Sequence, residues 1–297
     1  DYTDSLKLAN DAFQWRAKLS NEGILETWRL IGLSAARVSD NIAFGTFIDE
    51  YKKIASSSKR EITYNFVNGF KCRLEGKLKA AFNYLTKIAD TRDVDAYVYR
   101  ELATIYSFDE RFDEAISYAD KALAIDSGNP FILDIKAWSL LSLYRIERKS
   151  NLVYKIEECL DSLKIADERK KTTFFHVREK MKEVLVDNSS VSVLDSLASG
   201  KHTNIQLKIS ILEIFSAKGR NYQYSELLKS VNTLTSKKDR NKIIEVSLAK
   251  VKIKHAIDTG EYQEAEDLLS RWHPKFTDFL EAKLRSDLNK AKAYSKK

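Results

Sequence analysis

One sequence spacing occurs twice in this chain and limits the folds that are open to it. Gly69 lies as far before Ala103 in the sequence as Ala81 lies before Ala115. Two independent pairs of small residues that share one period indicate an internal repeat. A repeat of about 34 residues is a single supersecondary unit, which buries its apolar face only against neighbouring units. We therefore expect an array of similar units.

The stretch 95–130 shows what one unit contains. Apolar and small residues recur at helical spacing in two runs. The first run consists of Tyr99, Leu102, Ala103 and Tyr106, and the second consists of Ala115, Ile116, Ala119, Ala122 and Leu123. The segment 126–130 (DSGNP) ends the second run, because Gly and Asn accept left-handed backbone and Pro cannot continue a helix. The pattern predicts two helices joined by a tight turn.

This unit resembles the tetratricopeptide repeat (TPR), which follows the pattern W-x2-L-G-x2-Y, then A-x3-F, then P, and has the same period. The residues that match it within 95–130 are Tyr99, Leu102, Ala103, Tyr106, Ala115, Ala119, Ala122, Asp126 and Ser127. Ala103 stands where the family has Gly, Ala119 where it has an aromatic residue, and Ser127 where it has Pro.

The same pattern occurs in two further places. Gly69 and Cys72 fit it one unit earlier, and the segment 260–265 (GEYQEA) fits its turn and second-helix start. The resemblance covers roughly 61–145 and 239–273. It implies an all-α fold, an α-solenoid of antiparallel helix pairs in a right-handed superhelix, with a concave surface lined by the first helix of each pair. The low content of Gly (9) and Pro (2) also favours long helices with short connections.

We expect three parts along the chain. Residues 1–60 form degenerate N-terminal helices, and residues 61–187 form TPR-like repeats with an irregular helical extension. Residues 188–297 form basic C-terminal TPR-like repeats with a capping helix. Because the sequence starts with Asp rather than Met, we also expect it to be a piece of a longer polypeptide.

The sequence contains no phosphate-binding glycine loop, no G-x-S-x-G and no H-E-x-x-H motif. Its four histidines form no pair at helical metal-ligand spacing, and Cys72 and Cys159 are expected to be buried, reduced thiols. We therefore expect neither an enzyme nor a cofactor or metal. No apolar run approaches the roughly 20 residues of a membrane span, and no signal-peptide pattern is present. We expect a cytoplasmic protein that does not bind membranes.

The resemblance places a ligand groove along the first helices of successive pairs. The residues expected to line it are Phe66, Phe70, Arg73, Tyr97, Arg100, Glu101, Thr104, Asp134 and Trp138. An aromatic patch on a concave surface suits a peptide or helix ligand. Some members of the family bind the C-terminal carboxylate of heat-shock chaperones with a cluster of Lys, Asn and Arg. This chain lacks that cluster, since Phe66, Phe70 and Glu101 occupy matching positions. The alternative is that several of these side chains pack against a neighbouring helix.

Charge is distributed unevenly. Residues 200–297 hold 20 Lys and Arg against 12 Asp and Glu, a net of +8, while the whole chain carries +7. The residues of the expected basic patch are Lys237, Lys238, Arg240, Lys242, Lys250 and Lys254. Such a patch predicts weak, salt-sensitive contact with nucleic acid or an acidic surface. The alternative is a solvated helix face.

Three functions follow from these patterns. The first is a non-catalytic TPR-like module that binds a peptide or protein partner in its concave groove. The second is the C-terminal sensor or regulatory arm of a larger protein, for example an NLR-like STAND antiviral protein. The third is a nucleic-acid-binding solenoid that uses the basic C-terminal third. The sequence does not identify the partner or the oligomeric state.

Overall fold

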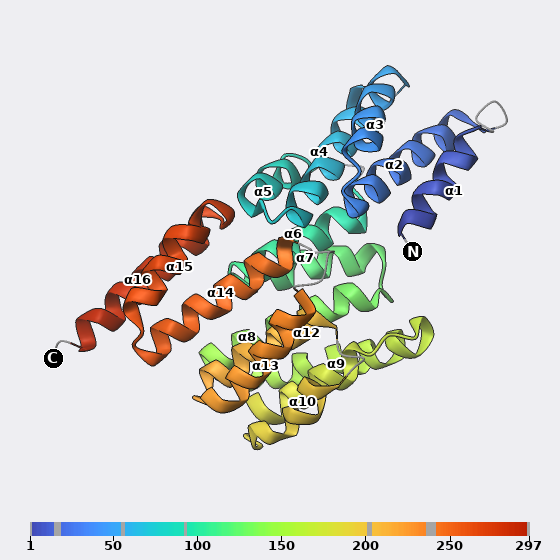
Figure 1. Cartoon of the computed structure of the whole chain (residues 1–297). Coiled ribbons are helices and arrows are strands. Elements are labelled where there is room, and N and C mark those ends of the chain that lie inside the picture. The colour runs from blue at the N-terminus through green and yellow to red at the C-terminus, as the bar shows by residue number, and fades with distance from the viewer. Residues whose placement is uncertain are drawn as a thin grey trace. The chain divides into compact units, whose positions relative to one another are not determined.

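The computed structural model describes residues 2–14, 19–54, 57–91, 94–200, 204–235 and 242–295. Over these residues the protein contains sixteen α-helices, two short 3-10 helices and no β-strand (Figure 1). The all-α class expected from the sequence is therefore confirmed. None of the described helices combines the length and the apolar character that crossing a membrane requires.

The chain forms two compact units, Asp1–Val94 and Asp95–Lys297. The helices of the first unit are α1 (Tyr2–Gln14), α2 (Asn21–Val38), α3 (Asn41–Ile54), α4 (Ser57–Leu74) and α5 (Leu78–Thr86). Successive helices of this unit pack on one another, and α2 also packs against α4. The expected boundary between residues 60 and 61 falls inside α4, because this helix already begins at Ser57.

Two glycines let helices of the first unit approach closely. A Cβ atom at Gly32 of α2 would lie 2.8 Å from ring atoms of Phe47 on α3, and one at Gly69 of α4 would lie 2.8 Å from Leu85 Cγ on α5. Phe47 and Leu85 are fully buried, so their surroundings hold them in place. Gly69, one of the repeat landmarks in the sequence, is therefore a contact position between two helices.

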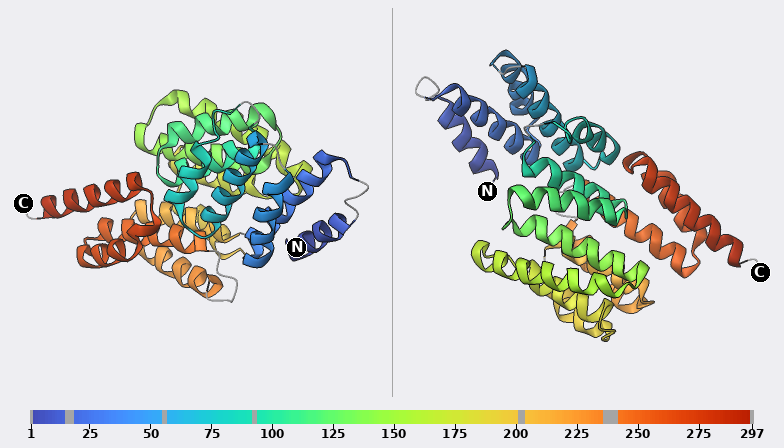
Figure 2. Two further views of the ribbon diagram at one scale, coloured as in Figure 1. Left: turned by 90° about the horizontal axis from the view of Figure 1, so that it is seen from above. Right: turned by 180° about the vertical axis from the view of Figure 1, so that it is seen from behind.

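The second unit holds the remaining helices. They are α6 (Ala96–Phe108), α7 (Phe112–Ile125), α8 (Pro130–Glu147), α9 (Ser150–Lys170), α10 (Phe174–Leu185), α11 (Asp195–Ser199), α12 (Ile205–Ala217), α13 (Asn221–Thr235), α14 (Lys242–Thr259), α15 (Tyr262–Trp272) and α16 (Asp278–Ser295), with 3-10 helices η2 (Val191–Leu194) and η3 (His273–Lys275). Figures 1 and 2 show α6, α7, α8 and α9 side by side, each packed on the next.

The helix pair predicted over 95–130 is present as α6 and α7. The carboxylate of Asp95 accepts hydrogen bonds from two backbone N–H groups in the first turn of α6, at 2.8 and 3.2 Å. Asn129 caps α8 in the same way, at 3.0 and 3.3 Å. Pro130 is the first residue of α8, where its fixed φ suits a helix and its missing N–H has no intrahelical role. Local sequence signals thus determine where these helices begin.

One hydrophobic core runs through most of the second unit. It includes Phe112 of α7, Met181 of α10, Leu194 of η2, Leu207 of α12 and Val251 of α14. The expected boundary between residues 187 and 188 does not separate two cores, because buried side chains on both sides of it pack together. The exposed segment 187–190 (DNSS) between α10 and η2 is a surface connection over a continuous core.

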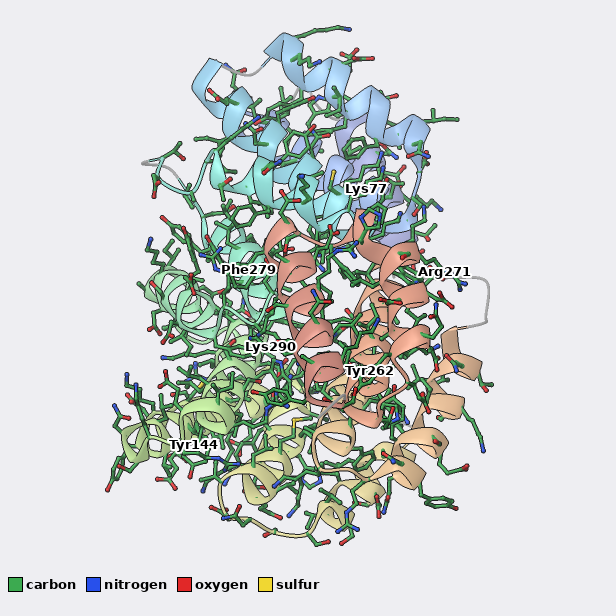
Figure 3. All side chains as sticks on the ribbon, turned by 90° about the vertical axis from the view of Figure 1, so that its left-hand side faces the viewer. Lys77, Tyr144, Tyr262, Arg271, Phe279 and Lys290 are labelled. Carbon is green, nitrogen blue, oxygen red and sulfur yellow. The ribbon has the colours of Figure 1, made fainter. Side chains whose placement is uncertain are left out.

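The last three helices, α14, α15 and α16, pack against one another. Figure 3 shows α16 with Phe279 towards one end and Lys290 towards the other, beside α15 with Tyr262 and Arg271. The hydroxyl of Tyr262 donates to the carbonyl of Ala291 at 3.2 Å, which ties α15 to α16. Arg111 of the α6–α7 turn lies with its guanidinium carbon 5.2 Å from the ring centroid of Phe279.

Candidate functional site: a charged pocket in the second unit

The turn between α6 and α7 carries a buried carboxylate that three lysines surround. Glu110 has a left-handed backbone conformation, with φ 62°. Lys254 of α14 forms an ion pair with its Oε1 atom, and Lys283 of α16 forms one with Oε2 at 2.5 Å. The Nζ atom of Lys250 lies 3.7 Å from Oε1. Side chains of α14 and α16 therefore converge on one glutamate.

Lys250 is only 5% exposed. Its Nζ atom lies 3.0 Å from Glu213 Oε1 on α12 and donates to the backbone carbonyl of Phe108 at 3.2 Å. Burial disfavours the charged form of Lys250, but Glu213 and Glu110 more than offset this and raise its pKa. Burial likewise opposes the charge of Glu110, but the three lysines outweigh it and hold the pKa of this carboxyl well below its usual range. The ion cluster consists of Glu110, Glu213, Lys250, Lys254 and Lys283.

Asp109 lies next to the ion cluster in the same turn. It is buried, and its Oδ1 atom has no hydrogen-bond partner. Burial raises the pKa of Asp109 to about 6, and hydrogen bonding by Thr277 with the charges of Lys250 and Arg111 offsets burial only in part. At neutral pH this carboxylate is therefore charged in a place that favours its neutral form.

Asp109→Asn is expected to remove a pH dependence of stability. The folded pKa lies above the unfolded one, so the native state takes up a proton first, and wild-type stability gains on the order of 2 kcal/mol from Asp109 as pH falls from 7.5 to 4.5. Burial lowers the pKa of His255, which acts with the opposite sign. Urea unfolding of wild type and variant at both pH values isolates the Asp109 contribution. Parallel pH dependence in the two proteins would contradict it.

A pocket of about 520 Å³ lies between α8, α12 and α14. Its lining residues are Arg145, Glu213, Ser216, Ala217, Gly219, Val251, Lys254 and Asp258. Glu213 and Lys254 also belong to the ion cluster, so the pocket and the cluster are continuous. This charged pocket presents two cations and two carboxylates, a composition suited to binding polar groups.

Ser216 joins two titratable groups at one side of the charged pocket. Its Oγ atom donates to Asp258 Oδ2 at 3.2 Å and lies 3.0 Å from Nδ1 of His255. The imidazole stacks on Tyr224 with ring centroids 3.6 Å apart. A hydrolytic triad places the histidine between the serine and the acid, whereas here the serine is in the middle. The order of the three side chains therefore differs from that of a hydrolytic triad.

The expected groove residues of the first unit are mostly interior. Phe66 and Phe70 of α4 are buried, with ring centroids 6.4 Å apart. Arg73 is half-buried, and its guanidinium carbon lies 5.4 Å from the Phe70 centroid. The prediction that Phe66 and Phe70 line an open groove is wrong. In this unit α4 packs on more than one neighbour, and its apolar side chains are covered.

The expected groove residues on α6 divide into buried and accessible side chains. Glu101 is buried and accepts a 2.7 Å hydrogen bond from Arg100, so it is not free for a ligand. Thr104 donates to the backbone carbonyl of Arg100 at 2.8 Å, within the helix. Tyr97 is 43% exposed. The prediction of a ligand-facing Glu101 is wrong, whereas Tyr97 presents an accessible aromatic surface.

Asp134 and Trp138 of α8 are covered by a side chain of α10. Arg178 is buried and donates from Nε to Asp134 Oδ1 at 2.7 Å. Its guanidinium carbon lies 5.0 Å from the Trp138 ring centroid. Both residues are half-buried, and α10 occupies part of the surface expected for a partner. The alternative, packing against a neighbouring helix, holds here.

The expected basic patch is only partly described. Lys237, Lys238 and Arg240 lie outside the described residues, and Lys242 is exposed at the start of α14. Lys250 and Lys254 of the expected patch are paired with glutamates in the ion cluster. The glutamates that neutralise these two lysines are far away in the sequence, so a count of the charges near the lysines does not detect them. The sensor-arm alternative stays a prediction.

Four charged residues of the charged pocket and ion cluster were not among the site residues expected from the sequence: Arg145, Glu213, Glu110 and Lys283. The spacing of Lys250, Lys254 and Asp258 is one signal that could have identified part of the site. Residues four apart share a helix face, so three charged groups lie on one side of α14. The partners in the α6–α7 turn and on α8, α12 and α16 have no comparable signal.

Over the described residues, no three His, Cys, Asp or Glu side chains are placed to share a metal ion. No protein-family model matches the chain, and a search of curated proteins finds no match either.

Proposed function

We propose that this chain is a helical-repeat module that binds another protein or a peptide without catalysing a reaction. We further propose that the helices of the second unit form an α-solenoid of antiparallel, TPR-like pairs. Three contacts support this arrangement: α6 packs on α7, α14 packs on α15, and the first helices α6 and α8 also touch each other. Contacts between near neighbours of this kind are typical of stacked repeats.

The observation that carries the proposal is a pair of exposed aromatic rings one repeat apart. Tyr97 and Phe131 are 43% and 51% exposed, and each is the second residue of its helix, α6 or α8. Their spacing in the sequence equals that between Gly69 and Ala103. Phe174, the first residue of α10, packs edge-on against Phe131 with centroids 5.3 Å apart. We call Tyr97, Phe131 and Phe174 the aromatic row, after their positions at the starts of α6, α8 and α10.

The aromatic row suits a protein partner on physical grounds. Aromatic side chains are enriched in protein interfaces, because they bury a large area at a small cost in side-chain entropy. Arg100 places its guanidinium carbon 4.8 Å from the Tyr97 ring centroid, which adds a cation at the edge of the row. A partner segment with apolar side chains is the ligand class that this surface favours.

Tyr97→Ser combined with Phe131→Ser is expected to abolish partner binding while leaving the fold intact, because both rings are exposed. Tagged full chain is used to capture proteins from a native lysate, and captured proteins are quantified by mass spectrometry. The double variant should capture any specific partner at least about tenfold less than wild type does, because the interface loses two anchor residues. The matched control is Tyr154→Ser on α9, where the ring is 75% exposed but lies outside the aromatic row.

Equal capture by wild type, the double variant and the Tyr154→Ser control would contradict the proposal. Circular dichroism of each variant, compared with wild type, separates a loss of binding from a loss of fold.

A further inference from the structure

We propose that the charged pocket binds a small zwitterion, a molecule that carries both a carboxylate and an ammonium group. Arg145 would receive the carboxylate and Asp258 the ammonium. This inference does not depend on the protein-binding proposal, which concerns the aromatic row on α6, α8 and α10. It concerns the pocket that residues of α8, α12 and α14 line; Figure 1 labels these three helices.

Arg145 is the cation of the charged pocket that remains available. Lys254, the other cation, is already paired with Glu110. Arg145 is half-buried and forms no hydrogen bond or ion pair with any residue that the structure describes. Its charge is close enough to Lys250 to act against the protonated form of that lysine. Because the guanidinium of Arg145 lies near another cation and its N–H donors have no partner among the described residues, it favours binding of a carboxylate.

Asp258 is the carboxylate of the charged pocket that remains available. Glu213, the other one, is paired with Lys250 at 3.0 Å. Asp258 accepts one hydrogen bond, from the neutral hydroxyl of Ser216. His255 contacts the same hydroxyl, and burial lowers the pKa of its ring, so it is neutral at pH 7 and does not compensate the charge. An ammonium group on a ligand would neutralise Asp258.

The two free charges select against simpler ligands. An inorganic anion at Arg145 would meet the carboxylates of Asp258 and Glu213 in the same pocket, and a simple amine would meet Arg145 and Lys254. A zwitterion satisfies both groups without leaving either ligand charge beside a like charge. The volume of about 520 Å³ lies in the range of small-molecule sites and has room for an amino acid or a dipeptide.

Calorimetric titration of the full chain with a series of zwitterions of increasing length tests the proposal. The probes are glycine, β-alanine, 4-aminobutyrate and 6-aminohexanoate, with the dipeptide Gly-Gly, because their charges are separated by increasing distances. At least one is expected to bind with a stoichiometry of one. Butyrate and butylamine, which carry one charge each, are expected to bind at least tenfold more weakly than the best zwitterion.

Three variants test whether the binding takes place in the charged pocket. Arg145→Met and Asp258→Asn should each weaken the best zwitterion at least tenfold, and Arg145→Lys, which keeps the charge, should weaken it less. The matched controls are Lys155→Met and Asp161→Asn on the exposed side of α9, which should bind as wild type does. Variants are compared only where their circular dichroism matches wild type.

The proposal is overturned if none of the five probes binds, if butyrate or butylamine binds as tightly as the zwitterions, or if the control variants lose as much affinity as the pocket variants. Tyr97→Ser with Phe131→Ser leaves the charged pocket intact and should keep zwitterion binding, so the failure of one proposal is distinguishable from the failure of the other.

Discussion

Glu110→Gln should lower the free energy of unfolding by about 3 kcal/mol, the effect of removing one partner from a buried ionic network. Glu110 is the carboxylate that Lys254 and Lys283 share, and no other carboxylate among the described residues pairs with either lysine. Glutamine has nearly the same shape but carries no charge, so packing is kept while two lysines lose their counterion. Urea unfolding at pH 7 measures the change.

The first turn of α7 provides the matched control. Glu114 pairs with Arg111 at 2.5 Å, but its side chain is 42% exposed. Glu114→Gln should therefore change stability by no more than about 0.5 kcal/mol, as for other surface ion pairs. An equal loss in the two variants would show that the ion cluster contributes no more than an exposed pair.

Lowering the pH should remove the contribution of Glu110 to the free energy of unfolding. The lysines lower its folded pKa below the unfolded value of 4.5, so its stabilisation is complete above about pH 4.5 and is lost as pH falls towards the folded pKa. The difference between wild type and Glu110→Gln should thus shrink below pH 4.5. A difference that is constant from pH 7 to pH 3 would contradict this assignment.

Gly69→Val should destabilise the first unit by about 2–3 kcal/mol, the usual cost of forcing extra atoms into a packed interface. The new Cβ would lie 2.8 Å from Leu85 Cγ and 3.3 Å from Tyr84 Cβ. Leu85 is fully buried, so relief requires α4 and α5 to separate. Urea unfolding followed by circular dichroism measures the loss.

Gly45→Ala should have the opposite sign. Gly45 also lies within a helix of the first unit, α3, but a Cβ there meets no atom within 4 Å. Alanine should therefore stabilise the protein by about 0.5–1 kcal/mol through helix propensity alone. If Gly69→Val were stabilising as well, close packing of α4 against α5 would not explain why residue 69 is a glycine.

Local signals predicted the helices well. Asp95 and Asn129 each have an oxygen that caps the helix that follows, and the turn after residue 125 contains the expected stop residues, so α6, α7 and the start of α8 follow from sequence. Helix starts depend on the chemistry of a few adjacent residues. That chemistry is visible without knowledge of the fold.

Long-range contacts were the part that sequence could not predict. Arg178 covers Asp134 from 44 residues away, and Glu110 pairs with lysines 144 and 173 residues away. A charge pattern shows which residues are polar, but not which distant carboxylate neutralises a given lysine. For this reason the expected groove and basic patch did not include the ion-pair partners of Asp134, Lys250 and Lys254.

Site-specific photocrosslinking tests the proposed function most directly, because it reports contact rather than loss of binding. A photoreactive phenylalanine analogue is placed at Tyr97, Phe131 or Tyr154 in the full chain, and crosslinked proteins from a native lysate are identified by mass spectrometry. The proposal predicts that Tyr97 and Phe131 capture the same partner and that Tyr154 does not. Capture that is equal at all three positions, or absent at Tyr97 and Phe131, would show that the aromatic row is not a protein-binding surface.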